Sequence, residues 1–133
     1  MELSKKSLLT PEQRQHWLQQ WAREADRLEE RRRQLRAVAE PVAREIGAHW
    51  PQASLWQFGS SLGPGFHADS DLDLAVADLP AEALIRAFTL AQACAMRVVD
   101  QRGLAPVALD LVRLEALPSV WQERIQREGH RLR

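Results

Sequence analysis

Residues suited to phosphate and metal chemistry lie between residues 58 and 76, in the segment FGSSLGPGFHADSDLDLAV. Gly59 and Ser60 end a short apolar run, and a turn or helix start at such a place exposes backbone N–H groups that can bind phosphate oxygens. After ten further residues, Asp71 and Asp73 alternate with leucines. This alternation predicts two carboxylates on one face of a strand, with Cα atoms about 6–7 Å apart. Such a pair can bind Mg²⁺ together with substrate phosphates, so the segment indicates phosphoryl or nucleotidyl transfer.

A third acidic residue, Asp110, lies between two leucines in VALDLV, residues 107–112. Its charge faces away from its apolar neighbours in a strand. If the strands at 70–77 and 107–112 are adjacent, Asp110 completes a three-carboxylate metal site with Asp71 and Asp73. The alternative is a solvated strand face for the first two aspartates and a surface acid or arginine partner for the third. The glycine–serine turn upstream of all three favours the metal site.

The elements that must position these residues can be predicted from the hydrophobic periodicity. Helices are expected from Thr10, which begins a capping box with Gln13, to about residue 40, and then over 41–49, 79–100 and 118–128. Pro41 should break or kink the first of these. Strands are expected over 54–58, 70–77 and 107–112. This order predicts an α/β (α+β) fold in which residues 51–133 form a small mixed sheet flanked by helices. Residues 1–50 form a helical arm packed on the core or extending from it.

Composition limits the class of protein further. The chain has 133 residues, no net charge and one cysteine, Cys94, so no internal disulfide can form and a cytoplasmic location is expected. No apolar run approaches the ~20 residues of a membrane span. Residues 51–120 carry four basic and eight acidic side chains, which suits a metal site better than direct DNA binding.

The set Gly59–Ser60, Asp71-x-Asp73 and Asp110 resembles the motif of the DNA polymerase beta nucleotidyltransferase superfamily. More narrowly, the chain is similar over residues 35–133 to the minimal nucleotidyltransferases that serve as antitoxins of HEPN-domain toxins. The resemblance implies the nucleotidyltransferase fold, a triphosphate bound by Gly59 and Ser60, and Mg²⁺ held by the three aspartates. Asp110 is also a candidate for the base that activates the attacking hydroxyl.

The implied reaction is transfer of a nucleotide, expected to be AMP from ATP, to a hydroxyl such as a tyrosine of a HEPN-type partner. This AMPylation would silence the toxin. Many relatives carry Arg-Ala-Arg-Gly directly after the Gly-Ser pair, whereas this chain has Ser61, Leu62, Gly63 and Pro64 there, without a basic side chain. Phosphate charge would then be balanced by metal and backbone, by a distant residue such as Arg113, or by the partner. Two alternatives stay open: an antitoxin that acts by stoichiometric binding, and a stand-alone transferase for a small hydroxylated molecule.

Several other residues have competing interpretations. Trp17 and Trp21, one helical turn apart, could pack on this domain's own sheet or anchor a partner subunit, and a homo- or hetero-oligomer is compatible with the second case. A solvated helix face is favoured over RNA or partner binding for Arg31–Arg33. Cys94 is expected in the core. In the loop, His67 is expected on the surface and Asp69 in a turn or cap.

Overall fold

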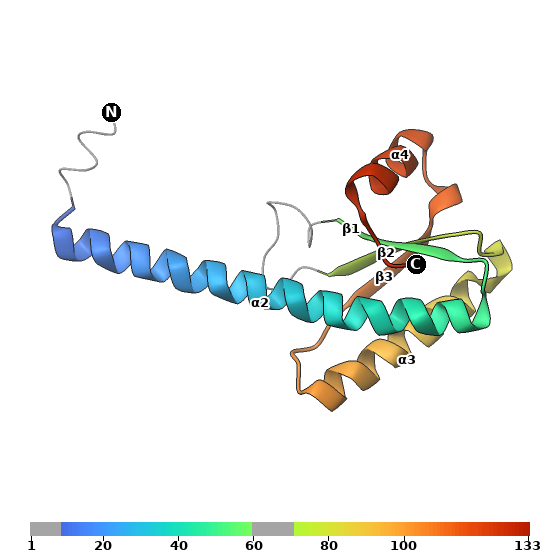
Figure 1. Cartoon of the computed structure of the whole chain (residues 1–133), viewed down its shortest axis with the longest axis horizontal. Helices are drawn as coiled ribbons and strands as arrows, with labels where there is room; N and C mark the ends of the chain where they lie inside the picture. Colours follow the sequence, from blue (N-terminus) through green and yellow to red (C-terminus); the bar gives the residue numbers. More distant parts are fainter. Residues whose placement is uncertain (1–8, 60–70) are drawn as a thin grey trace.

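The computed structural model describes residues 9–59 and 71–133, which form a small mixed sheet with helices on both sides (Figure 1). The helices are α2 (Pro11–His49), α3 (Leu84–Arg102) and α4 (Ser119–Glu128), with short 3₁₀ turns η2 (Ala81–Ala83) and η3 (Leu114–Ala116). The strands are β1 (Ser54–Phe58), β2 (Leu72–Ala77), β3 (Leu109–Arg113) and β4 (His130–Arg131). The predicted α/β class with a small mixed sheet is therefore confirmed. The three predicted strands all form, within two residues of their expected bounds.

The sheet order is β3-β2-β1-β4. β1 is antiparallel to β2 and to β4, whereas β2 and β3 are parallel and are connected through α3. The predicted adjacency of the second and third strands is thus correct. β4 was not predicted, because two residues are too few to show a hydrophobic period and the strand exists only through its pairing with β1.

The two faces of the sheet pack against different helices. Helices α2 and α3 cover one face, and α4 covers the other, which we call the α4 face (Figure 1). The larger core lies beneath α2 and α3, where Leu72 and Leu74 of β2 and Leu109 and Leu111 of β3 are buried. The smaller core lies on the α4 face. Its buried residues are Trp56, Ala75, Ala77, Leu114 and Ile125, and its partly buried residues are Phe58, Val112 and Leu117. Every second residue of β2 and β3 therefore points towards α4.

Helix α2 is one continuous element of 39 residues. It begins with the predicted capping box: the N–H of Gln13 donates to Oγ1 of Thr10 at 3.1 Å, and the N–H of Thr10 donates to Oε1 of Gln13 at 2.9 Å. Of the predicted break or kink at Pro41, the break is wrong, and with it the separate helix over 41–49, because α2 continues through this residue to His49. An interior proline costs about 3 kcal/mol. Burial of the neighbouring residues Leu35, Val38, Ala39, Val42, Ala43 and Ile46 offsets this cost.

The two halves of α2 have different surroundings. Residues 11–27 are all exposed, and the helix projects from the body of the molecule over this length (Figure 1). From Leu28 onwards the helix packs against the sheet and α3, and its buried residues belong to the main core. Helix α2, which lies within the predicted arm of residues 1–50, therefore also contributes residues to the core. Within the described residues, no helix combines the length and the apolar character that a membrane crossing needs.

Candidate functional site

Gly59 and Asp73 are in close contact where β1 ends and β2 begins. Phe58 is the register partner of Asp73, so Gly59 lies directly beyond that pair. Gly59 has φ +87°, a left-handed conformation that favours glycine. A Cβ on Gly59 would collide with Oδ2 of Asp73 and lie 3.2 Å from its Cγ. The glycine is therefore required both by its backbone conformation and by the carboxylate that lies against it.

Asp110 is the register partner of Asp73 across the parallel pair β2–β3. Their neighbours in each strand are buried on the opposite face, so both aspartates are on the α4 face. Asp71 precedes β2 by one residue and is exposed, whereas Asp73 is half-buried. The structure thus brings Asp73 beside Asp110, and Asp71 lies two residues before Asp73 in the chain. The other predicted phosphate ligand, Ser60, lies outside the described residues, as do His67 and Asp69 of the same loop.

The electrostatics of the site are dominated by uncompensated negative charge on Asp73. Burial raises the pKa of its carboxyl to about 6, and the nearby carboxylates of Asp110 and then Asp71 add to the increase. Over residues 9–59 and 71–133, none of the ion pairs or hydrogen bonds found includes a side chain of these three aspartates. A divalent cation between these groups would remove the repulsion.

The residues present fit Mg²⁺ as a pair rather than as a closed cage. In the described part of the chain, no three His, Cys, Asp or Glu side chains lie close enough together to hold one metal ion. Asp73 and Asp110 are cross-strand neighbours on one face, and Mg²⁺ commonly takes only one or two carboxylates, completing its shell with waters and substrate phosphates. Asp71 as a direct third ligand stays a prediction.

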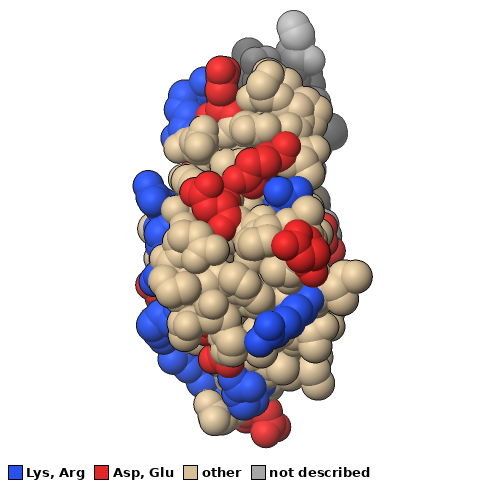
Figure 2. Space-filling model, turned by 90° about the vertical axis from the view of Figure 1, so that its right-hand side faces the viewer, with Lys and Arg blue, Asp and Glu red and all other residues tan. Residues whose placement is uncertain are grey.

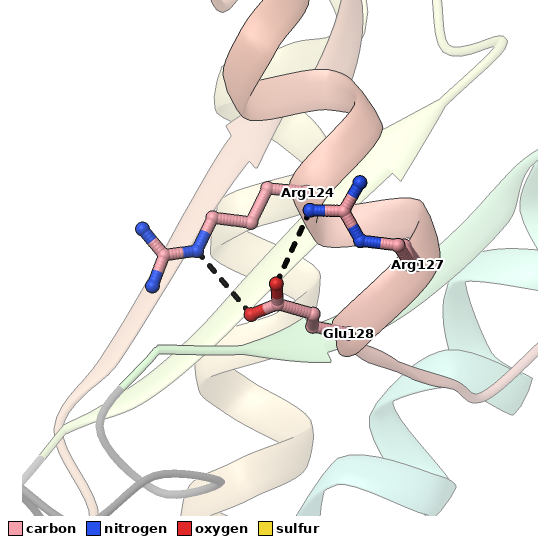
Figure 3. A network of polar contacts seen from close by, with 3 residues as sticks. All are labelled: Arg124, Arg127 and Glu128. Carbon is pink, nitrogen blue, oxygen red and sulfur yellow. Dashed lines mark hydrogen bonds and ion pairs between the residues drawn. The ribbon is translucent and has the colours of Figure 1, made fainter.

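Helix α4 places basic side chains on the same face, towards the same end of the sheet. Glu128 accepts from Nε of Arg124 and from a terminal nitrogen of Arg127, both at 3.3 Å (Figure 3). The next residue, Gly129, is packed against β1: a Cβ there would lie 3.0 Å from the carbonyl oxygen of Gln57. Because Gln57 is two residues before Gly59, the C-terminal end of α4 lies close to the candidate site. The three side chains carry a net positive charge.

Two arginines of α2 donate hydrogen bonds to other elements of the fold. Nε of Arg36 donates to Oε1 of the buried Gln57 at 2.7 Å, and this contact supports the end of β1. The guanidinium of Arg31 donates to the carbonyl oxygens of Ala105 at 3.3 Å and Pro106 at 2.6 Å, in the loop before β3. The expectation of a fully solvated face was therefore wrong for Arg31, whose Nε is buried.

The spacing of Arg31 could have indicated this, since it lies three residues after Leu28 and four before Leu35, on the apolar stripe. Arg33, by contrast, is exposed and pairs with Glu30, as expected for a solvated face. Arg113, named as a possible phosphate ligand, is directed elsewhere: it is at the other end of β3 from Asp110 and donates from Nε to the carbonyl oxygen of Leu79 at 3.0 Å.

The opposite end of the molecule has a different surface (Figure 2). Acidic and basic side chains are interspersed there around a largely uncharged centre.

Cys94 is buried in the main core, as predicted, and burial raises the pKa of its thiol, so it takes no part in the site's chemistry.

Comparisons with known proteins add no identification. No model of a known protein family matches the chain, and no curated protein is significantly similar to it.

The raised pKa of Asp73 predicts an unusual dependence of stability on pH. The folded state retains a proton on Asp73 up to about pH 6, whereas the unfolded state loses it near pH 3.8. The stabilising contribution of this group is thus complete below pH 3.8 and is lost as the pH rises through 6. Because the carboxyl is half-exposed, we expect solvent screening to reduce the effect to about 1 kcal/mol. Urea unfolding without metal should show that the free energy of unfolding of Asp73→Asn rises relative to that of wild type by this amount between pH 4 and 8. Parallel curves would contradict the prediction.

Proposed function

We propose that the protein is a Mg²⁺-dependent nucleotidyltransferase that transfers a nucleotide, with ATP as the expected donor of AMP, to a hydroxyl group. The observation that carries the proposal is the position of Asp73. This carboxylate lies against a left-handed glycine at the end of β1 and beside Asp110 on β3, with no cationic partner among the described residues. A structural aspartate would ordinarily be paired, whereas a metal-binding one needs this uncompensated charge.

In this proposal the residues of the chain bind and orient the reactants. Gly59 allows the backbone to approach the triphosphate closely, since no side chain intervenes. Asp73 and Asp110 hold Mg²⁺, with Asp71 contributing negative charge next to them. When bound, Mg²⁺ neutralises phosphate charge and stabilises the charge that develops during transfer.

The chemical step is a displacement at the α-phosphorus. The acceptor oxygen forms a bond to this phosphorus, the bond to the bridging oxygen of the β-phosphate breaks, and pyrophosphate leaves. We assign the hydroxyl proton to Asp110, which is exposed on the α4 face and open to an incoming acceptor. The net positive charge of Arg124, Arg127 and Glu128 favours a polyanion at this end of the sheet.

We propose a tyrosine hydroxyl of a HEPN-type toxin as the acceptor, so that the protein acts as an antitoxin. The motif resembles that of antitoxins with this activity, and a protein acceptor would itself supply part of the surface that encloses the reacting groups. An acceptor of this kind would approach the exposed Asp110.

The test is to incubate the protein with Mg²⁺ and ATP labelled on the α-phosphate, with and without a HEPN-domain protein encoded beside its gene. We expect label on the HEPN protein and release of pyrophosphate, both abolished by EDTA. Neutralisation of the toxin without label, by wild type and Asp71→Ala/Asp73→Ala alike, would replace this proposal with stoichiometric binding. Label on a small hydroxylated molecule in the absence of a protein acceptor would establish the stand-alone transferase instead.

A further inference from the structure

The projecting part of α2 carries an apolar surface that nothing covers among the described residues. Trp17 is 49% exposed, Leu18 51% and Trp21 60%. The two indole rings contact each other edge to face, with centroids 5.7 Å apart and an interplanar angle of 85°. This contact organises the rings on one side of the helix. The interpretation in which these tryptophans pack on the domain's own sheet is therefore excluded.

A helix that projects into water in this way is not stabilised by packing. Residues 11–27 are all exposed and extend over about 25 Å, and isolated helices of this length are marginal in water. The apolar residues Trp17, Trp21 and Leu28 follow one another at four and seven residues, which is typical of a seam between paired helices.

We propose that this segment is a dimerisation arm that pairs in antiparallel orientation with the same segment of a second copy of the chain. The register is set by the tryptophans, with Trp17 of each chain packed against the partner's Trp21. About one helical turn beyond each of these contacts, the same register brings Arg14 of one chain to Glu24 of the other, because Arg14 precedes Trp17 by three residues and Glu24 follows Trp21 by three. Each dimer thus contains two opposite-charge pairs, one on each side of the two-fold axis.

Charge complementarity selects this arrangement over the parallel one. In a parallel pair with the tryptophans in register, Arg14 would face the partner's Arg14 and Glu24 the partner's Glu24. Like charges at such positions oppose association, whereas opposite charges favour it and fix the register. Glu24 already contacts Arg27 on its own helix, which leaves one carboxylate oxygen for a second partner.

The available area indicates a dimer of moderate affinity. A fully covered tryptophan buries about 150–250 Å², so four half-exposed rings supply about 300–500 Å². Leu18, Ala25 and the aliphatic stems of the flanking arginines and glutamines must supply the rest of the ~1,200 Å² at which stable interfaces begin. We therefore expect a dissociation constant in the micromolar range, on the order of 1–100 μM.

Sedimentation equilibrium of the full chain tests the proposal. Wild type should show a reversible monomer–dimer equilibrium, and Trp17→Glu/Trp21→Glu should weaken it at least ~100-fold, because central tryptophans are typical binding hot spots. The matched control is Ile85→Glu/Met96→Glu, which places the same two negative charges on α3 at side chains that are 81% and 72% exposed. Far-UV circular dichroism should show that both variants are folded. A monomeric wild type, or equal dimerisation by the double tryptophan variant, would overturn the proposal. This holds even if the tryptophans proved necessary for binding a HEPN-type protein.

The antiparallel register has its own test. Arg14→Glu and Glu24→Arg should each weaken the dimer about tenfold, and the two changes together should restore it, because the pairs are regenerated with reversed charges. Gln20→Cys should form a disulfide between chains. In the antiparallel pair the two-fold axis lies midway between Trp17 and Trp21, so Gln20 comes near its own copy there. In a parallel pair it does not. The native thiol, Cys94, is buried and should stay silent. Failure of the double variant to recover, or of Gln20→Cys to cross-link, would exclude this register.

Discussion

Asp73→Asn should reduce nucleotide transfer by about 10³-fold or more while leaving the protein folded and, at neutral pH, more stable. The loss follows because the amide removes the half-buried negative charge that lies between Gly59 and Asp110. A metal ion that stabilises a transition state by several kcal/mol changes the rate by this amount when its binding is lost. The gain in stability follows from removal of a carboxylate whose ionisation is opposed by burial and by its neighbours.

The matched control is Asp78→Asn, which makes the same chemical change at the other end of β2. Asp78 is exposed, has φ +61°, and its backbone N–H donates to Glu115 at 2.8 Å, so an asparagine is well tolerated there. Transfer by this variant should be close to that of wild type. Mg²⁺ should raise the melting temperature of wild type and of Asp78→Asn but not that of Asp73→Asn. If Asp73→Asn retained both activity and the response to Mg²⁺, the metal site would have to be elsewhere.

Gly59→Ala should lower the free energy of unfolding by about 2–4 kcal/mol and the melting temperature by roughly 10 °C. Two effects add at this position. The left-handed conformation, at φ +87°, strains any residue with a Cβ, and that Cβ would collide with Oδ2 of Asp73. Transfer should also fall, since Asp73 must move to make room.

Gly103→Ala separates these two effects. Gly103 ends α3 with φ +64°, but a Cβ there would meet no atom within 4 Å. The variant should therefore show the backbone strain alone, about 1–2 kcal/mol. Combining Gly59→Ala with Asp73→Ala should recover part of the lost stability, because the colliding carboxylate is then absent. If Gly59→Ala and Gly103→Ala were equally destabilised and the double variant recovered nothing, the contact with Asp73 would be energetically unimportant.

The helices and main strands could be predicted because their signals are local. Alternation of Leu72, Leu74 and Val76 defined β2, and the Thr10 capping box defined the start of α2. The prediction failed at Pro41, where local chemistry disfavours a helix, because the stabilising contacts come from the sheet and α3, distant in sequence. The pairing of β4 with β1 and the hydrogen bond of Arg36 to Gln57 are also long-range, so no nearby pattern could indicate them. The spacing of Arg31 indicated a place on the apolar stripe of α2 but not the carbonyl oxygens that its guanidinium contacts.

The sequence could predict which residues form the candidate site, but it could not predict their contacts or the pKa of Asp73. The spacing of Asp71 and Asp73 and the isolated charge of Asp110 indicated a shared face, and the register Asp73–Asp110 places the latter two side by side. The contact of Gly59 with Asp73 and the raised pKa could not be predicted, since both depend on how β1 meets β2. The role of Ser60 stays a prediction, because it lies outside the described residues.

The position of β3 in the sheet gives the two central carboxylates different freedom of movement. β2 is hydrogen-bonded on both sides, whereas β3 is the last strand of the described sheet and has a neighbour on one side only. Backbone amides of β3 that point outwards should therefore exchange with solvent faster than those of β2. We expect Asp73, on the inner strand, to move less than Asp110, whose strand has a neighbour on one side only. Binding of a cation should slow this exchange, which makes the outer amides of β3 a reporter of site occupancy without any turnover.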